Sequence, residues 1–265
     1  MAKGFKKSGR AGREQASSAL STARGEDFPL TRAVSDKESR VIGRLSEGSL
    51  HAYLKKYIEP DESYHEQKIL GFWADVARND EIFEIQTRQF GNLRRKLEAF
   101  LHEHRVTVIY PIAETKYLSW IDPDTGETTE PRLSPKKGKP HEILAELYYI
   151  RDQLLHPNLT FRIIMLELTE LKSLCGWSAD RKRGAWRVDR VPGAVTREIN
   201  LSRREDFAAL LPEDLPEIFT AAELAKAYRQ KGRRASYTLG TLVSLGIIEK
   251  VGERGRAFLY SVKRD

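Results

Sequence analysis

Residues 72–87 read Phe-Trp-Ala-Asp-Val-Ala-Arg-Asn-Asp-Glu-Ile-Phe-Glu-Ile-Gln-Thr, and this stretch decides the expected fold. Its composition predicts two β-strands, and the Asn79-Asp80 pair between them is typical of a tight turn. In the second strand Glu84 and Gln86 lie two residues apart, so they share one face of the strand. The stretch therefore predicts a hairpin with a polar face at the end of its second strand.

Asp75 lies in the first strand of this hairpin, among residues that would bury it. A buried carboxylate is costly without a partner, and the turn would bring Glu84 and Gln86 back beside it. Two carboxylates on neighbouring strands, with the carbonyl of Ile85, make an oxygen-rich site that suits Mg²⁺ or Mn²⁺ better than zinc. The competing interpretation is an ordinary edge strand, with Asp75 paired to a basic residue such as Arg94 or Arg95.

The flanking sequence completes an α-β-β-β-α-β order. Apolar residues at helical spacing predict helices from about Leu50 to Ile58 and over 92–104, and runs at 65–70 and 105–112 predict further strands. Beyond them we expect more elements: a hairpin at 122–126, a basic loop at 134–139, a helix at 140–155, a strand at 159–168, an irregular hairpin at 176–204 and a linker at 213–217. No fixed repeat period is visible, which excludes solenoids and propellers.

With Asp75 on the second strand and Glu84-Ile85-Gln86 on the third, this order resembles the PD-(D/E)XK nuclease superfamily over roughly residues 47–112. The resemblance implies a restriction-endonuclease-like α/β core and a metal-dependent hydrolase that cuts DNA phosphodiester bonds. Asp75, Glu84 and the carbonyl of Ile85 would then bind Mg²⁺ or Mn²⁺, and Gln86 would orient the attacking water. Glu47, four residues before His51, matches the further acid that the first helix often supplies.

Gln86 departs from the superfamily pattern, in which a lysine usually holds this position. A neutral amide cannot supply positive charge to the attacking hydroxide or to the developing phosphorane. Some active restriction enzymes also carry Gln here. The alternative is a non-catalytic DNA-binding protein or regulator that keeps the nuclease fold as a scaffold.

The chain also resembles a family of uncharacterised prokaryotic proteins. The shared motifs match Ser49–His51, Glu84–Thr87 and the loop Arg132–Gly138, which contains Lys136 and Lys137. The resemblance implies a nuclease without naming its substrate. We expect Lys136 and Lys137 to contact nucleic acid.

The C-terminal sequence predicts a helix-turn-helix followed by a two-stranded wing. Thr220-Ala-Ala-Glu223 is a capping box, a second helix is expected over 233–245, and two strands follow at 247–251 and 257–262. Residues 215–262 resemble winged-helix domains, in which the start of the second helix enters the major groove. The expected DNA contacts are Arg233, Arg234, Ser236 and Tyr237 on that helix and Arg254 and Arg256 at the wing. The alternative is a winged helix used for protein contact or dimerisation.

Charge and composition fit a DNA-binding protein. The 265 residues carry a net charge of +7, which attracts polyanions. Cys175 is the one cysteine, which excludes an intrachain disulfide and a cysteine zinc site. No signal peptide or membrane span is apparent, so we expect a cytoplasmic protein.

We therefore expect three segments: a disordered basic arm at 1–44, a nuclease-like domain at 45–212 and a winged-helix domain at 213–265. The expected partner is DNA, in defence, restriction or repair. A homodimer and partner proteins in those pathways are also compatible with the sequence.

Overall fold

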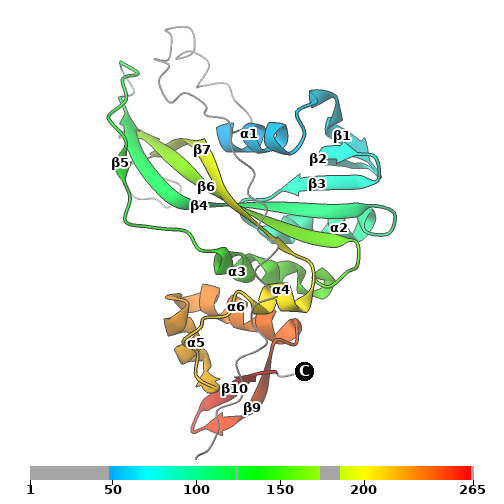
Figure 1. Cartoon of the computed structure of the whole chain (residues 1–265), viewed down its shortest axis with the longest axis vertical. Coiled ribbons are helices and arrows are strands. Elements are labelled where there is room, and N and C mark those ends of the chain that lie inside the picture. Colours follow the sequence, from blue (N-terminus) through cyan, green and yellow to red (C-terminus); the bar gives the residue numbers. More distant parts are fainter. Residues whose placement is uncertain (1–47, 123–124, 174–185, 264–265) are drawn as a thin grey trace, which may run out of the picture. The chain divides into compact units, whose positions relative to one another are not determined.

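The computed structural model describes residues 48–122, 125–173 and 186–263. These residues form a mixed α/β fold with one large sheet, a smaller three-stranded sheet and several helices (Figure 1). Within these ranges no helix is both long enough and apolar enough to cross a membrane. The expected basic arm, Glu47 and Cys175 lie outside the described residues.

The large sheet has the strand order β1-β2-β3-β4-β6-β7, and β5 pairs with β4. Its strands are β1 (His65–Ile69), β2 (Phe72–Arg78), β3 (Glu81–Ile85), β4 (Arg105–Ile121), β5 (Arg132–Leu133), β6 (Leu159–Ser173) and β7 (Trp186–Leu201). The β3-β4 and β4-β6 pairs are parallel, whereas the other pairs are antiparallel. The sheet is therefore mixed, with its parallel pairs in the centre.

The expected hairpin is confirmed. β2 and β3 pair with Arg78 opposite Glu81, so Asn79-Asp80 forms a two-residue turn. Asn79 has a φ of +52°, a left-handed conformation that asparagine tolerates better than most residues. The turn residues thus specify the register that sets β3 beside β2.

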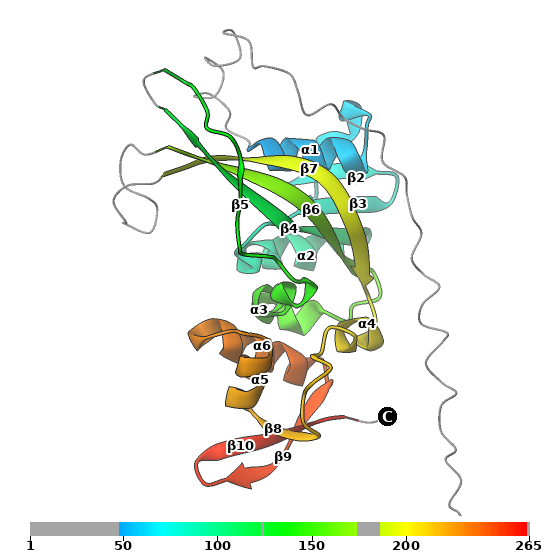
Figure 2. The ribbon, with the colours of Figure 1, turned by 60° about the vertical axis from the view of Figure 1, so that its left-hand side comes forward.

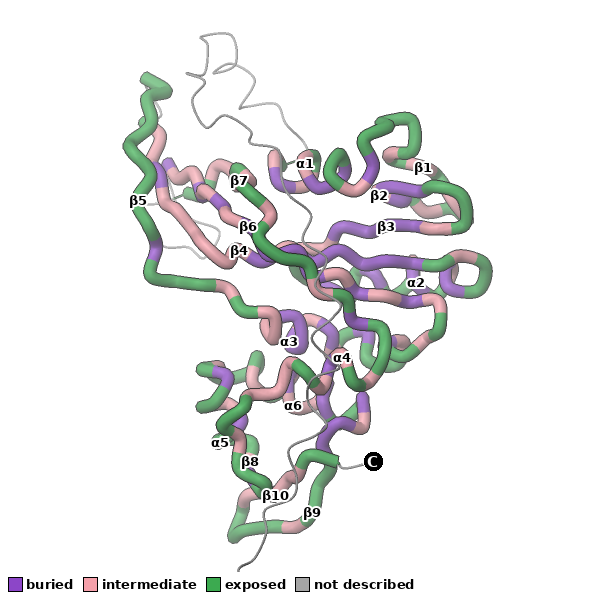
Figure 3. The backbone as a smooth tube through the Cα atoms, in the orientation of Figure 1, coloured by how far each residue is buried: buried purple, intermediate pink, exposed green. Residues whose placement is uncertain are grey.

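Helices cover both faces of the sheet. On one face α1 (Ser49–Ile58) contributes Leu50 and Leu54, which pack against Val76 and Phe83. On the other face α2 (Arg94–Phe100) and α3 (Ile143–Leu147) pack over a second apolar cluster. Figure 3 shows the central strands as the most buried part of the sheet.

Five elements form the C-terminal part: β8 (Ile218–Thr220), α5 (Ala221–Ala227), α6 (Gly232–Ser244), β9 (Ile248–Arg254) and β10 (Ala257–Val262). The capping box is confirmed, since the Thr220 hydroxyl accepts the Glu223 N–H and the Glu223 carboxylate accepts the Thr220 N–H. β8 was not expected, and it adds to the β9-β10 hairpin to give the order β8-β10-β9. Leu224 and Leu242 belong to the same apolar cluster as Leu144 of α3. The boundary at residue 212 stays a prediction.

Several expected elements were wrong in extent or shape. The predicted helix at 92–104 begins with the 3-10 turn η2 (Phe90–Leu93), and the one at 140–155 is divided into η3 (Pro140–Glu142), α3 and η4 (Tyr148–Gln153). A further short helix, α4 (Arg204–Ala208), was not expected. The described part of the predicted irregular hairpin is the long strand β7, which tolerates Pro192 because it lies at the edge of the sheet.

Candidate active site

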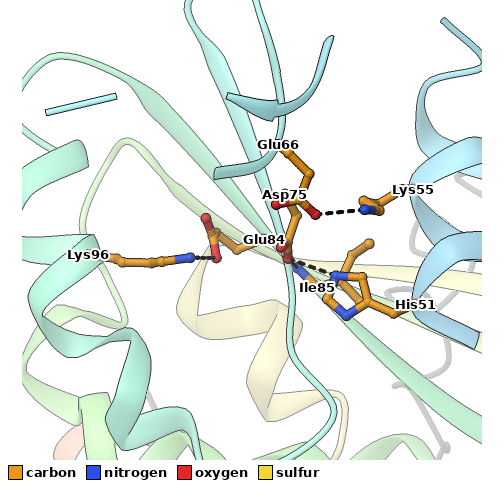
Figure 4. Close-up of polar contacts among 7 residues, drawn as sticks. All are labelled: His51, Lys55, Glu66, Asp75, Glu84, Ile85 and Lys96. Carbon is orange, nitrogen blue, oxygen red and sulfur yellow. Dashed lines mark hydrogen bonds and ion pairs between the residues drawn. The ribbon is translucent and has the colours of Figure 1, made fainter. Parts of the chain in front are cut away.

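Asp75 lies on β2, one residue before Val76, which pairs with Phe83 of β3. Its carboxylate Oδ2 accepts a hydrogen bond from the N–H of Ile85 at 2.7 Å. The same oxygen lies 3.3 Å from Nε2 of His51 on α1 (Figure 4). Asp75 is therefore held by the neighbouring strand and by the first helix.

Glu84 lies on β3 and is 2% exposed. Its Oε2 lies 2.7 Å from Nζ of Lys96 on α2. Its other oxygen, Oε1, is buried and has no hydrogen-bond partner in the described part of the chain. A buried acceptor without a donor is costly, so this oxygen is suited to receive a cation or a water molecule.

The pKa values of the two carboxyl groups shift in opposite directions. Burial and the charge of Asp75 together raise the pKa of Glu84 to about 7, because Lys96 only partly offsets these two effects. Burial alone would also raise the pKa of Asp75, but His51 and the N–H of Ile85 outweigh it and hold the pKa below its usual range. Such divergent pairs are typical of functional sites.

The two carboxylates interact electrostatically, but their partners come from different helices. Asp75 contacts α1, Glu84 contacts α2, and Figure 4 shows the two side chains turned toward these helices. Among the described residues, no three or more His, Cys, Asp or Glu side chains are grouped so that they could hold a metal. Convergence of Asp75, Glu84 and Gln86 on one metal ion therefore stays a prediction.

Gln86 is engaged by the turn that follows β3. Its side-chain nitrogen donates to the carbonyl oxygens of Arg88 and Gln89, the latter at 3.3 Å. Its backbone N–H donates to the carbonyl of Ile109 at 2.9 Å. In this arrangement Gln86 braces the turn, and its role in orienting water stays a prediction.

Lys96 is the site residue that the sequence analysis does not name. It lies three residues after Leu93 and four before Phe100, both buried, and this spacing places it on the inward face of α2. This spacing is the signal in the sequence from which an inward-facing Lys96 could have been predicted. The alternative in which Asp75 pairs with Arg94 is wrong, because Arg94 pairs with Glu98 and Asp152 instead.

Two expected DNA contacts on α6 are engaged within the protein. Arg234 donates to the carbonyl and the carboxylate of Glu142, each at 3.2 Å. The Tyr237 ring stacks on Tyr148 with 4.7 Å between ring centroids. These two side chains hold α6 against the helices beside the large sheet, but Arg234 is still exposed, so DNA contact by either residue stays a prediction.

The remaining expected contacts are on the surface. The exposed residues are Arg233, Ser236, Arg254, Arg256, Lys136 and Lys137. The loop that carries Lys136 and Lys137 is tied to β4, because the N–H of Ser134 donates to Lys116 and that of Gly138 donates to Ala113. These side chains can reach a ligand without breaking an ion pair such as the one between Arg234 and Glu142.

Comparisons with known proteins place this chain in a family. The model described as Domain of unknown function (DUF8091) matches residues 48–202. An uncharacterized protein of Treponema pallidum (strain Nichols) is 31% identical over 227 residues, which cover 83% of this chain and 86% of that protein. No solved structure matches. The chain belongs to the DUF8091 family, and the matched span includes Asp75, Glu84 and Lys96.

Proposed function

We propose that this protein is a metal-dependent nuclease of the PD-(D/E)XK type that hydrolyses DNA phosphodiester bonds. One observation carries the proposal: two largely buried carboxyl groups on adjacent strands have pKa values shifted in opposite directions, and one keeps a buried oxygen that no donor among the described residues contacts. A structural protein gains nothing from that arrangement, because an unpaired buried acceptor lowers stability. A hydrolytic site can use it.

The order of elements supports this proposal. α1, β1, β2, β3, α2 and β4 follow one another as in the restriction-endonuclease-like core, with Asp75 on the second strand and Glu84 on the third. The two helices α5 and α6 followed by the β9-β10 hairpin suit a winged helix. We therefore propose a nuclease core joined to a C-terminal winged helix.

The donor set suits Mg²⁺ or Mn²⁺. Carboxylate oxygens are the preferred ligands of these ions, which often bind one or two carboxylates and keep several waters. Glu84 offers the buried Oε1, and Asp75 and the carbonyl of Ile85 would complete the set. When bound, the metal would polarise the scissile phosphate and lower the pKa of a water molecule.

Lys96 provides the positive charge that Gln86 lacks. Its ammonium lies against Glu84 and lowers the pKa of Asp75 as well, so it acts on both carboxylates. In the proposed reaction Lys96 would favour the ionised form of Glu84 and offset the charge that develops on the phosphate oxygens. Gln86 would keep the following turn in place and orient water through its amide.

DNA would be held by exposed basic residues and one serine. We assign Arg254 and Arg256 to the wing, Arg233 and Ser236 to the start of α6, and Lys136 and Lys137 to the loop beside β4. In this assignment Arg234 and Tyr237 position α6 instead of contacting DNA. A cytoplasmic role in defence, restriction or repair, with partner proteins or as a homodimer, fits this assignment.

A second candidate function is a non-catalytic DNA-binding protein or regulator. The contacts of Glu84 with Lys96 and of Asp75 with His51 favour it, because each carboxylate already has a basic partner on a different helix. In that case the two contacts would serve only to hold α1 and α2 on the sheet.

One experiment separates the two functions. The protein and its Asp75→Asn/Glu84→Gln variant are incubated with supercoiled, linear, single-stranded and branched DNA, in Mg²⁺, in Mn²⁺ and in chelator. Metal-dependent cleavage by the parent but not by the variant supports the nuclease. Binding without cleavage in every condition supports the regulator.

A further inference from the structure

A second group of charged side chains lies where β4, β6 and β7 continue beyond the end of β3. β3 pairs with β4 only as far as Ile109, whereas β4 continues to Ile121 beside β6 and β7 (Figures 1 and 2). We call this group the arginine cluster and define it by five basic residues: Arg88, Lys116, Lys172, Arg187 and Arg190. None of the five was among the expected nucleic-acid contacts.

The strand register brings these residues together. Arg190 pairs with Glu170 across β6 and β7, and Arg187 pairs with Lys172. Lys116 on β4 forms an ion pair with Glu170, and Lys172 lies 3.5 Å from the same carboxylate. One glutamate therefore faces basic side chains from three strands.

The arginines carry more positive charge than their neighbours balance. The side chain of Arg190 is partly buried, and the charged groups that act on it are Arg187, Arg88, Glu170 and Asp189. Burial and the two neighbouring arginines lower its pKa. Glu170 is already shared with two lysines, so like charges are held close together at a cost that a bound anion would remove.

Asp189 is shared between the cluster and α1, because its carboxylate also accepts a hydrogen bond from the backbone N–H of Arg190 at 2.7 Å. Its carboxylate accepts hydrogen bonds from the N–H of Ser49 at 3.2 Å and from the Ser49 hydroxyl. It therefore anchors the start of α1, the helix that carries His51 beside Asp75. This contact also fixes the cluster near the candidate active site.

The other connection to the site runs through the turn after β3. Arg88 follows Gln86 by two residues, and its carbonyl accepts from the Gln86 amide. Arg88 is exposed, and its charge acts on Arg190. The cluster is thus connected to the strand of Glu84 through Gln86 and to the helix of His51 through Asp189.

We propose that the arginine cluster binds the sugar-phosphate backbone of a nucleic acid and leads it to the carboxylates; this inference rests on the proposed nuclease function. Guanidinium groups match phosphate geometry and pair with it bidentately. Arg190 and Arg187 pair with Glu170 and Lys172, which are two residues apart on β6, so the two arginines are about 7 Å apart along the strand. That span exceeds one phosphate at roughly 3.4 Å of helix axis per nucleotide, so the occupant is a polymer and not a single nucleotide.

The test measures binding of a labelled DNA duplex in chelator over a range of salt concentrations. The variants are Arg88→Ala/Arg187→Ala and Arg190→Gln, and the matched control is Arg151→Ala/Arg203→Ala, which removes the same charge from other elements. The double variant should make the slope of log K against log salt shallower by about 1.8, or about 0.9 per lost phosphate contact. The control should keep the parental slope.

Arg190 is partly buried, so its variant is first checked by thermal unfolding. If Arg190→Gln is not folded, the exposed pair Arg88 and Arg187 carries the test. Equal slopes for the parent and the Arg88/Arg187 variant would overturn the proposal. So would inorganic phosphate or a mononucleotide competing with the duplex at micromolar concentration, because the site would then be a single-anion site.

Failure of the cluster and failure of the nuclease give different results. If the parent cleaves DNA but the Arg88/Arg187 variant keeps the parental salt slope, the proposed role of the cluster is rejected and the nuclease proposal stands. If the variant has a shallower slope but the parent cleaves no DNA with any metal, the cluster stands as a DNA-binding surface and the nuclease proposal is rejected.

Discussion

Nζ of Lys96 lies 2.7 Å from Oε2 of Glu84, so the helix after the hairpin supplies a cation to a strand that lacks one of its own. The strand position where a lysine was expected holds Gln86, whose amide instead braces a turn. The positive charge at the candidate site therefore comes from a residue ten positions later in the chain. Its importance can be measured directly.

Lys96→Met should lower cleavage by about 100-fold to 1000-fold, the usual range for loss of one preorganised donor. Lys96→Arg keeps the charge and should lose much less. The measurement is the single-turnover cleavage rate, with unfolding temperatures recorded in parallel. Arg95→Met, an exposed change on the same helix, serves as control, and equal losses for it and Lys96→Met would contradict the assigned role.

Asp75→Ala and Glu84→Ala should each abolish cleavage and leave DNA affinity nearly unchanged, because the basic surfaces supply binding while the carboxylates act in the transition state. Cleavage and duplex affinity are measured on the same preparations. A parallel loss of affinity would show that these residues support the fold instead.

Gln86→Ala should be milder, with a loss on the order of tenfold to a hundredfold, or about 1.4 to 2.8 kcal/mol. Gln86→Lys restores the usual motif residue, so activity should persist or rise. Rates are compared in Mg²⁺ and in Mn²⁺. If the parent is inactive with every metal and DNA form, and Gln86→Lys does not restore cleavage, the nuclease proposal is rejected in favour of the non-catalytic DNA-binding protein.

The stability of the metal-free protein should fall as pH rises from about 4.5 to about 7. In the folded protein Glu84 has a pKa of about 7 and keeps its proton until the pH approaches that value, whereas an unperturbed glutamate has a pKa of 4.5. Between these values the folded state binds more protons, so the free energy of unfolding decreases with rising pH. Urea unfolding across this pH range measures the free energy of unfolding, and Glu84→Gln should flatten its dependence on pH.

Asp75 should act in the opposite sense and in another pH range. Its folded pKa lies below the usual 3.8, so its contribution to stability is present above that value and is lost as pH falls further. Asp75→Asn should therefore flatten the pH dependence of stability below about 3.8. It should also reduce, but not remove, the slope between 4.5 and 7, because the charge of Asp75 is one cause of the raised Glu84 pKa. A slope in that range that depended on Asp75 alone would contradict the assignment to Glu84.

Arg254→Ala should weaken duplex binding and make its salt slope shallower by about one unit. Arg234→Ala should instead lower the unfolding temperature and leave the slope nearly intact, since Arg234 pairs with Glu142. Fluorescence anisotropy at several salt concentrations measures both. The reverse pattern would show that α6 leaves its partners when DNA binds.

Gly138→Ala should destabilise the protein by about 1 to 3 kcal/mol, the usual cost of overpacking. A Cβ at this position would lie 2.6 Å from the Ala113 carbonyl oxygen and 2.4 Å from a methyl group of Ile112. Urea unfolding measures the change. Gly252→Ala is the matched control, since its nearest neighbour would be 4.0 Å away, and equal effects of the two variants would contradict this account.

The hairpin and the order of elements were predictable because their signals are local. Alternation around Glu84, the Asn79-Asp80 turn and the Thr220-Glu223 capping box each depend on residues within one element or turn. β7 was harder to predict because its regularity comes from pairing with β6, and composition around Pro192 does not reveal that partner.

The candidate site was predictable only in part. Its carboxylates stand out as polar groups in apolar strands, so Asp75 and Glu84 could be selected. Their partners depend on how helices pack: His51 and Lys96 reach the strands from α1 and α2. The engagement of Arg234 and Tyr237 with η3 and η4 likewise follows from tertiary packing.

The parallel pairing of β4 with β6 has a consequence for how the chain folds. Val106 pairs with Leu159, so this pair closes a loop of some fifty residues, which is slow compared with the formation of a hairpin. The β2-β3 hairpin can form early, before the centre of the sheet exists. Glu84 would then remain hydrated and an ordinary acid until the later contacts with β4 and α2 bury it, so the carboxylate site would form only after the hairpin that carries it.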